Sequence, residues 1–302
     1  MPELPEVETI RRQLEPEIVG RRIVSAEILD ERWTRPEPPA GIAARLADRG
    51  IASAGRRGKY LLVGLDDGST LVMHLRMTGN LLLAEPDESV GRRFGAERLY
   101  EANASPAHLR AELELDDGRL LRFTDPRRFG HAALLDAAEL APYLDSRLGV
   151  EPLGDELTAE LIGRIAAGRT VPLKSFLLDQ RGIAGIGNIY ADEALHRAEL
   201  HPLSPAGSMR PEHWEALREG IVGALEAGLR NGGASIDDYR DSRGERGSMQ
   251  DEFLVHTRAG EECPRGDGRI SRIVVSGRST YFCPSCQVRL RRRRKPRSRP
   301  AR

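Results

Sequence analysis

Residues 1–20 read MPELPEVETIRRQLEPEIVG, and this stretch determines how the fold begins. Apolar residues recur through it at three- and four-residue steps, at Leu4, Val7, Ile10, Leu14 and Ile18. Such spacing predicts one amphipathic helix, because it places the apolar side chains on a single face. Gly20 is expected to end this helix.

Short runs with a β-type pattern follow Gly20. They are RIVSAEIL, KYLLVGL, STLVMHLRM, NLLLA, AELELDD, RLLRFTD and HAALLD. Several end at the dipeptides Asp67-Gly68 and Asp117-Gly118, which are typical of antiparallel hairpins. Residues 1–135 are therefore predicted to form a β-sandwich with a leading helix. The segment from Glu85 to Ala107 has neither period and is expected to be a long surface loop.

The pattern becomes helical from Leu157, in LTAELIGRIAAG, VPLKSFLLDQ, NIYADEALHRA and PEHWEALREGIVGALEAGLRNGG. We expect a linker over 136–150, a helical domain over 151–240 and a charged, glycine-rich loop over 241–252. Residues 253–288 hold two strand-like runs, RISRIVV and STYFC, bracketed by cysteines. The predicted fold class is α+β, with a basic tail over 289–302.

Composition limits the class of protein. The 302 residues are 39% apolar and 30% charged with a mean hydropathy of −0.45, which indicates a soluble globular chain. No apolar run is long enough to span a bilayer, and the start carries acids rather than a basic export region. Three cysteines within residues 263–286 indicate a reduced compartment. We expect a cytoplasmic monomer without membrane contact.

The net charge of zero conceals an uneven distribution. Lys and Arg total 46, as do Asp and Glu, but residues 289–302 hold nine basic residues and no acid. The remaining chain has 37 basic against 46 acidic residues, so a DNA site on it requires a local basic patch. The tail, RLRRRRKPRSRPAR, repels itself and is predicted to be disordered. It is either a solvated charge run or a non-specific DNA tether.

Pro2 and Glu3 allow two interpretations. Proline suits a helix start through its fixed φ, and an acid there complements the helix dipole. Alternatively, Met1 is removed and Pro2 becomes a free secondary amine. An α-amine has an ordinary pKa near 8, so part of it is uncharged at neutral pH and can attack C1′ of a deoxyribose to form a Schiff base. Glu3 would then move protons as a general acid and base.

Six blocks favour the second interpretation. The chain resembles formamidopyrimidine-DNA glycosylases in MPELPEVETIRRQLEP, RRGKYLLV, HLRMTG, TDPRRFG, LLDQRGIAGIGNIYADEAL and GRSTYFCPSCQ, from Pro2 to Gln287. The resemblance implies a β-sandwich, a helical domain with a helix-two-turn-helix, a zinc-bearing β-hairpin and double-stranded DNA bound in the cleft between the halves. It also implies a bifunctional DNA repair enzyme, a glycosylase and abasic-site lyase that removes 8-oxoguanine and formamidopyrimidines.

Catalytic roles follow from the matching positions. The resemblance implies that Pro2 is the nucleophile, that Glu3 and Lys59 manage protons, and that Arg278 promotes δ-elimination after β-elimination. Without the resemblance, Lys59 is most simply an exposed lysine.

The resemblance also implies a set of DNA contacts, at His74, Met77, His108, Arg127, Arg128, Phe129, Lys174, Asn188 and His256. Met77 would fill the space of the flipped base, Arg127 pair with the orphaned cytosine and Phe129 wedge between base pairs, since the stack must be kept from closing. Asn188, at a helix start, would contact a phosphate, and Lys174 and His108 match positions that hold the DNA backbone. His74 and Arg128 are DNA-binding positions without a more specific role. The alternatives are core packing for Met77, a β-turn for residues 125–128, and a tight turn for Gly185-Ile186-Gly187.

The hairpin departs from the family pattern of Cys-x2-Cys, sixteen residues, Cys-x2-Cys, which is a zinc signature. Gly266 stands at the second ligand position, and Cys263, Cys283 and Cys286 remain. Asp267 or a water could complete a zinc site. His256, where a tyrosine is usual, is a phosphate contact, a replacement ligand or a surface histidine.

The loop expected over the flipped base bears on substrate preference. DSRGERGSMQ, residues 241–250, resembles the loop that caps the flipped base, with Met249 where Phe is common. Two other functions stay open: an endonuclease VIII-like glycosylase for oxidised pyrimidines, and a non-catalytic lesion-binding paralogue. The start PELPEVET with Arg127 and Phe129 favours the purine branch, and the complete set Pro2, Glu3, Lys59 and Arg278 opposes the paralogue.

Overall fold

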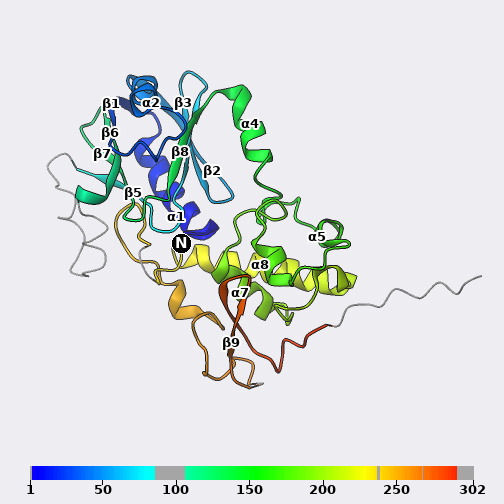
Figure 1. Ribbon diagram of the computed structural model, residues 1–302. Helices are drawn as coiled ribbons and strands as arrows, with labels where there is room; N and C mark the ends of the chain where they lie inside the picture. Colours follow the sequence, from blue (N-terminus) through cyan, green and yellow to red (C-terminus); the bar gives the residue numbers. More distant parts are fainter. Residues whose placement is uncertain (1, 86–105, 237–238, 267, 291–302) are drawn as a thin grey trace, which may run out of the picture. The chain divides into compact units, whose positions relative to one another are not determined.

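The computed structural model describes residues 2–85, 106–236, 239–266 and 268–290. The chain forms two compact units, Met1–Gly149 with Leu225–Glu252, and Val150–Ala224 with Phe253–Arg302 (Figure 1). Most of the expected loop of residues 85–107, Asp267, and all but the first two residues of the basic tail lie outside the described residues. The domain boundaries inferred from the sequence stay predictions.

The first unit begins with helix α1 (Leu4–Ile18), as predicted. All five residues of the apolar stripe are buried, so this face of the helix contributes to the core. Gly20 follows with a φ of +86°, a left-handed conformation that favours glycine and ends the helix.

Eight antiparallel strands form the body of this unit. They are β1 (Arg22–Ile28), β2 (Arg49–Arg57), β3 (Tyr60–Leu65), β4 (Thr70–His74), β5 (Asn80–Ala84), β6 (Leu109–Leu115), β7 (Leu120–Thr124) and β8 (His131–Leu135). Their order is β5-β7-β6-β1-β2-β3-β4-β8. β1 and β2 pair only at Arg22 with Gly50 and Ile23 with Arg49, so two four-stranded halves meet at a narrow junction. The expected Asp-Gly turns connect β3 to β4 and β6 to β7, with Gly68 and Gly118 at φ +84° and +85°.

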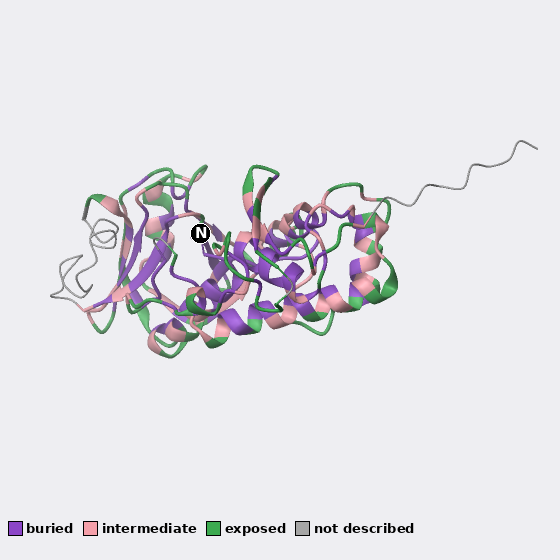
Figure 2. Cartoon of the chain, turned by 90° about the horizontal axis from the view of Figure 1, so that it is seen from below, coloured by how far each residue is buried: buried purple, intermediate pink, exposed green. Residues whose placement is uncertain are grey.

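A hydrophobic core is formed by residues from both halves; buried residues are purple in Figure 2. It combines Ile10 of α1 with Leu61 and Leu71 from one half and Leu113 and Phe123 from the other. Packing of apolar residues from both halves against each other is the arrangement of a β-sandwich. Tyr239, far along the chain, joins the same core.

Several elements were not predicted. Helix α2 (Pro39–Leu46) and strand β2 fill a stretch for which no element was expected, and helix α4 (Ala137–Asp145) lies in the expected linker. Short 3-10 turns occur at Pro106–His108, Ala206–Ser208 and Met249–Glu252.

The second unit is helical with a terminal hairpin. Its elements are α5 (Ala159–Ala166), α6 (Leu173–Leu178), α7 (Asn188–Arg197), the larger part of α8 (Pro211–Arg230), β9 (Ser271–Val275) and β10 (Arg278–Phe282). β10 packs against α7. Among the described residues, no helix combines the length and apolarity needed to cross a membrane.

Candidate functional site

The proposed nucleophile lies at a tightly fixed helix start. Pro2 and Glu3 are buried, and Glu3 is the N-cap of α1. Its backbone N–H donates to Glu6 Oε2 at 2.8 Å, and Glu6 Oε1 accepts the Ala234 N–H at 2.7 Å. Glu6 thus does more than complement the helix dipole, because it joins the start of α1 to the segment after α8. Gly233 permits this approach, since a Cβ there would lie 2.7 Å from Glu6 Cγ.

Lys59 is not the exposed lysine of the simpler interpretation. It follows Gly58, whose φ is +56°, in the turn between β2 and β3, and its side chain is only 5% exposed. Its positive charge is one of the causes that lower the pKa of His74. A buried lysine at a tight turn fits a proton-transfer role better than a solvated one.

His74 is a neutral, buried ring. Its Nδ1 accepts the Arg76 N–H at 2.9 Å, and its ring stacks on His131 with centroids 5.7 Å apart. Burial, with the charges of Arg76, His131 and Lys59, holds the pKa of His74 well below its ordinary value of 6.5. The expected DNA contact of His74 stays a prediction.

The Asp125 carboxylate organises the loop that presents Arg127 and Phe129. It accepts hydrogen bonds from the Thr78 hydroxyl, from the Arg127 N–H at 3.2 Å and from the Gly130 N–H at 2.7 Å. Asp125 is only 1% exposed, whereas Phe129 is 54% exposed. The Arg127 guanidinium lies 4.8 Å from the centre of the Phe129 ring, a cation–π distance. A large exposed aromatic beside a cation is what a wedge between base pairs requires.

The Met77 turn is joined to this loop. Thr78 supplies the hydrogen bond to Asp125, and the ring of Phe123 lies against the backbone of both Gly79 and Gly130. A Cβ would come within 3.0 Å of this ring at Gly79 and within 2.6 Å at Gly130. Met77 itself is partly exposed, so it is not a core residue. We call residues 75–79 and 125–130 together the insertion loops.

Arg128 and His108 lie beside the insertion loops in different ways. Arg128, at φ +57°, bonds Asp30 Oδ1 at 2.7 Å, and this hydrogen bond holds the pKa of Asp30 below its ordinary value. His108 is partly exposed, and its backbone carbonyl accepts the Asp125 N–H at 2.8 Å. The guanidinium of Arg128 is therefore already engaged, while His108 supports the loop through its main chain.

In the second unit, Lys174 and His256 belong to a buried network. Lys174 Nζ lies 2.7 Å from Asp192 Oδ1 and donates to Thr280 Oγ1 at 2.9 Å and Ser279 O at 3.0 Å. His256 Nδ1 lies 2.9 Å from Asp192 Oδ2. Lys174 and His256 are 0% and 5% exposed. Both side chains are therefore engaged within the protein, and the phosphate contacts expected for these two residues stay predictions.

Asn188 lies at a helix start and Arg278 follows a hairpin turn, and their roles toward DNA stay predictions. Asn188 is the first residue of α7, and its Nδ2 donates to Ser279 O at 3.1 Å. Ser276 and Gly277, at φ +49° and +75°, form a two-residue turn of the type I′ kind. Arg278 follows as the exposed first residue of β10.

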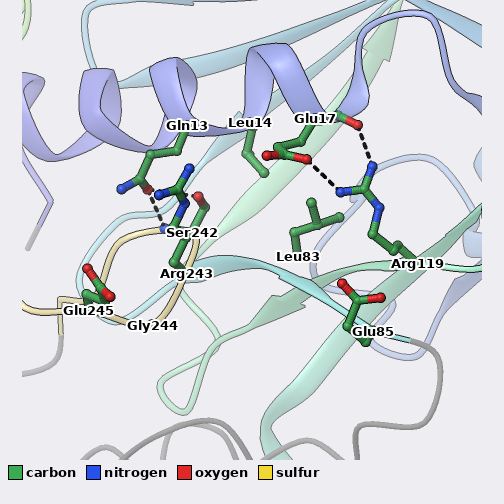
Figure 3. Close-up of a pocket in the computed structure, with 10 residues that line it drawn as sticks. All are labelled: Gln13, Leu14, Glu17, Leu83, Glu85, Arg119, Ser242, Arg243, Gly244 and Glu245. Atoms are coloured by element: carbon green, nitrogen blue, oxygen red, sulfur yellow. Dashed lines mark hydrogen bonds and ion pairs between the residues drawn. The ribbon is translucent and has the colours of Figure 1, made fainter.

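Residues 241–245 are bonded to α1 beside a pocket of about 540 Å³ (Figure 3). Gln13 Oε1 accepts the Ser242 N–H at 3.0 Å and its hydroxyl at 2.8 Å, and Gln13 Nε2 donates to Asp241 Oδ2 at 2.7 Å. At the other end of the pocket, the Arg119 guanidinium donates to Glu17 Oε2 at 2.7 Å. Gln13 therefore fixes the first residues of the loop expected over 241–252.

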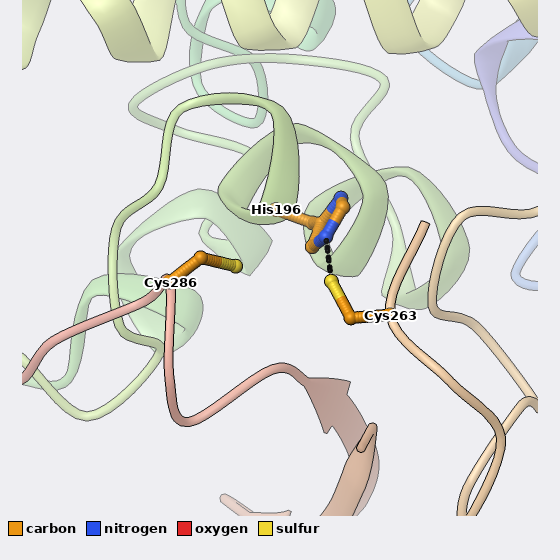
Figure 4. Close-up of side chains that lie close together, drawn as sticks. All are labelled: His196, Cys263 and Cys286. Atoms are coloured by element: carbon orange, nitrogen blue, oxygen red, sulfur yellow. Dashed lines mark hydrogen bonds between the residues drawn. The ribbon is translucent and has the colours of Figure 1, made fainter. Parts of the chain in front are cut away.

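Two of the cysteines lie beside His196, a histidine that no sequence pattern indicated as a ligand. His196, Cys263 and Cys286 each offer one ligand atom, and these atoms lie within 4.8 Å of one another (Figure 4). Of the described histidines, His196 rather than His256 occupies this group. Spacing could not reveal it, because His196 precedes Cys263 by 67 residues.

The thiols differ in their environments. Burial would raise the pKa of Cys283, but the N–H groups of Cys286 and Ser285 and the adjacent thiols bring it below its ordinary value. Burial and the neighbouring Cys283 and Cys263 raise the pKa of Cys286 to about 12.

Family models match nearly the whole chain. Residues 1–132 match the formamidopyrimidine-DNA glycosylase N-terminal domain, and residues 148–240 match its H2TH domain. Residues 260–288 match the zinc finger found in FPG and IleRS.

Individual relatives agree with these models. A formamidopyrimidine-DNA glycosylase of Chloroflexus aggregans is 47% identical over 290 residues, covering 95% of this chain and 99% of the relative. The enzyme of a Roseiflexus strain is 45% identical over 95% of this chain and all of its own.

Solved structures show the same similarity. A complex of Lactococcus lactis FPG with Fapy-dG-containing DNA matches with a TM-score of 0.83 at 33% identity, over 95% of this chain and 100% of that one. Lactococcus lactis Fpg with abasic-site DNA has a TM-score of 0.83 at 34% identity, with the same coverage. The chain belongs to the formamidopyrimidine-DNA glycosylase family, with the α+β fold predicted for it, and is an enzyme of the DNA glycosylase and AP lyase class.

Proposed function

We propose that this protein excises 8-oxoguanine and formamidopyrimidines from double-stranded DNA and then cuts the abasic strand by β,δ-elimination. The observation that carries the proposal is the buried Pro2-Glu3 pair at the start of α1, within a chain 47% identical to a named family member. The positive end of a helix disfavours a protonated amine beside it, which favours the uncharged form that a nucleophile needs.

The first chemical stage is base excision. The Pro2 amine attacks C1′ and gives up its N–H proton, the glycosidic bond breaks with its electron pair going to the base, and the leaving base takes up one proton. Glu3 protonates the sugar ring oxygen as the ring opens, leaving a Schiff base between Pro2 and C1′.

Strand cleavage follows from the Schiff base. Lys59 is proposed to assist the removal of the C2′ proton, so that the 3′ phosphate leaves by β-elimination. Arg278 promotes δ-elimination of the 5′ phosphate, which leaves a one-nucleotide gap bounded by phosphates.

DNA contacts are proposed to divide into inserted and supporting groups. Met77, Arg127 and Phe129 enter the duplex, since all three side chains are at least partly exposed on the insertion loops. His108 and Asn188 are proposed to contact the backbone. His74, Arg128, Lys174 and His256 are proposed to position these groups, because each is buried or already engaged.

The finger is proposed to hold one structural zinc through Cys263, Cys283 and Cys286. Zinc would cross-link these segments and take no part in the chemistry. The chain is proposed to act in the bacterial cytoplasm, where the chromosome is.

Borohydride trapping on an 8-oxoguanine:cytosine duplex tests the mechanism. Reduction should join the chain covalently to DNA, and a matched protein with one Gly inserted before Pro2 should form no adduct. An adduct with the blocked protein would overturn the role of Pro2.

Two further outcomes separate the alternatives. Faster processing of an oxidised pyrimidine than of 8-oxoguanine would identify an endonuclease VIII-like enzyme. Tight lesion binding by wild-type protein without base release would identify a binding paralogue.

A further inference from the structure

We propose that His196 of α7 is the fourth zinc ligand, so that the ion is held by His196, Cys263, Cys283 and Cys286. This inference rests on the zinc proposed for the finger and adds the ligand that the finger itself lacks. It places the metal between a helix of the H2TH region and the hairpin.

The finger alone offers too few ligands. Closed structural zinc sites have four protein ligands, usually thiolates and imidazoles. Gly266 stands where the second cysteine of the pattern would be, and its N–H donates to Cys263 O at 2.8 Å. The turn from Cys263 to Gly266 is thus formed, but Cys263 is the one cysteine ligand in it.

The position of His196 matches the missing ligand. Its Nε2 lies 3.4 Å from Cys263 Sγ. Tetrahedral zinc, with Zn–S near 2.3 Å and Zn–N near 2.0–2.1 Å, separates a nitrogen and a sulfur ligand by about 3.5 Å. Figure 4 shows the sulfurs of Cys263 and Cys286 directed toward the His196 ring from two different segments.

Cys283 completes the set. Its thiol is fully buried, contacts the thiols of Cys263 and Cys286, and accepts the N–H groups of Ser285 and Cys286. Backbone N–H groups directed at a sulfur support a thiolate ligand. His196, Cys263 and Cys286 hold three ligand atoms within 4.8 Å of one another, and Cys283, beside the two other thiols, is the fourth ligand of the proposed site.

His256 is a poorer candidate for the same position. Its Nδ1 is engaged by Asp192 at 2.9 Å, and its N–H donates to Glu193 Oε1 at 3.0 Å. His196 is 1% exposed and points at the thiols. A histidine that only donates to a thiol would occupy the same place, so the test must detect the metal bond itself.

X-ray absorption at the zinc edge of wild-type protein provides that test. We expect three sulfurs near 2.3 Å and one nitrogen near 2.0 Å. His196→Ala should weaken zinc binding by at least about 100-fold, since even residues behind the ligands contribute 10–100-fold. His196→Cys should restore binding, with a stronger sulfur-to-cobalt charge-transfer band after Co²⁺ substitution.

His201→Ala is the matched control. His201 is a half-buried histidine that packs on Phe282 with ring centroids 4.6 Å apart, and its loss should leave the zinc content unchanged. Circular dichroism of each variant identifies any that fail to fold.

Separate results overturn the two proposals. If His196→Ala keeps its zinc and its spectrum while Cys286→Ser loses zinc, the finger binds metal but His196 is not a ligand. If wild-type protein binds no zinc in metal-replete buffer, the zinc site itself is wrong.

Discussion

The ammonium group of Lys174 lies among a carboxylate, a hydroxyl and a carbonyl, with no exposed surface. Its nearest anion, Asp192, also binds His256 and the Tyr281 N–H. Removal of Lys174 would leave a buried carboxylate without its charge partner, and such changes cost about 3–5 kcal/mol.

We therefore expect Lys174→Met to lower the free energy of unfolding by about 3–5 kcal/mol. The slope of log K for DNA against log salt should stay unchanged, because no phosphate contact is lost. Denaturant titration and binding at several salt concentrations measure the two effects. A slope reduced by about 1 with unchanged stability would instead identify a direct phosphate contact.

The structural positions of some site residues could be predicted from the sequence, and those of others could not. Arg278 and Asn188 could be placed because local motifs fix their positions in a turn and at a helix start. His196 and the pairing of Thr78 with Asp125 could not, since each joins segments distant in the chain. Burial of Lys174 and His256 likewise depends on tertiary packing.

Strands β4 and β8 bring two histidines together across the sheet. His74 pairs with His131, and Tyr60 packs edge-on against His74 with centroids 4.6 Å apart. Burial, with the charges of Arg76 and Arg147, lowers the pKa of His131 from 6.5 to about 4. Both rings are neutral in the folded state near neutral pH.

This pair predicts an acid-sensitive fold. Because the folded pKa lies below the unfolded value, the stability that His131 contributes is fully present above about pH 6.5 and is lost as the pH falls toward 4. His131→Phe should therefore show a smaller fall in Tm between pH 7 and pH 4.5 than wild type. Thermal unfolding at the two pH values measures this, and equal falls would contradict it.

The elements with strong local patterns were predicted well. α1 and its end at Gly20 follow from periodicity and one glycine, and the Asp-Gly turns were found in place. β2 was missed because RGIASAGRR lacks apolar alternation, and it becomes a strand by pairing along its length with β3. α4 was missed because its nine residues contain Pro142, which a helix interior disfavours.

At the scale of the whole molecule, the distribution of charge matters more than its sum. Eight of the 46 basic residues lie in residues 291–302, after the last described residue, Leu290. If these residues bind phosphates, each contact should steepen the salt dependence of DNA binding by about 0.9.

A chain that ends at Leu290 tests the tail. We expect weaker binding to undamaged duplex and a shallower salt slope than for the full chain, with the same zinc content and the same trapping yield at low salt. Fluorescence anisotropy across a salt series measures the slope. Identical slopes would show that the tail is only a solvated charge run.

The ring of Phe123 lies against both Gly79 and Gly130, and so it supports the turn of Met77 and the loop of Phe129 at once. The Thr78 hydroxyl and the Asp125 carboxylate join the same two segments. The conformational entropy of arranging these loops is therefore lost once, during folding, and does not weaken each encounter with DNA. If Met77 and Phe129 enter the duplex as proposed, they do so with their loops already arranged, and this part of the entropy cost does not recur on binding.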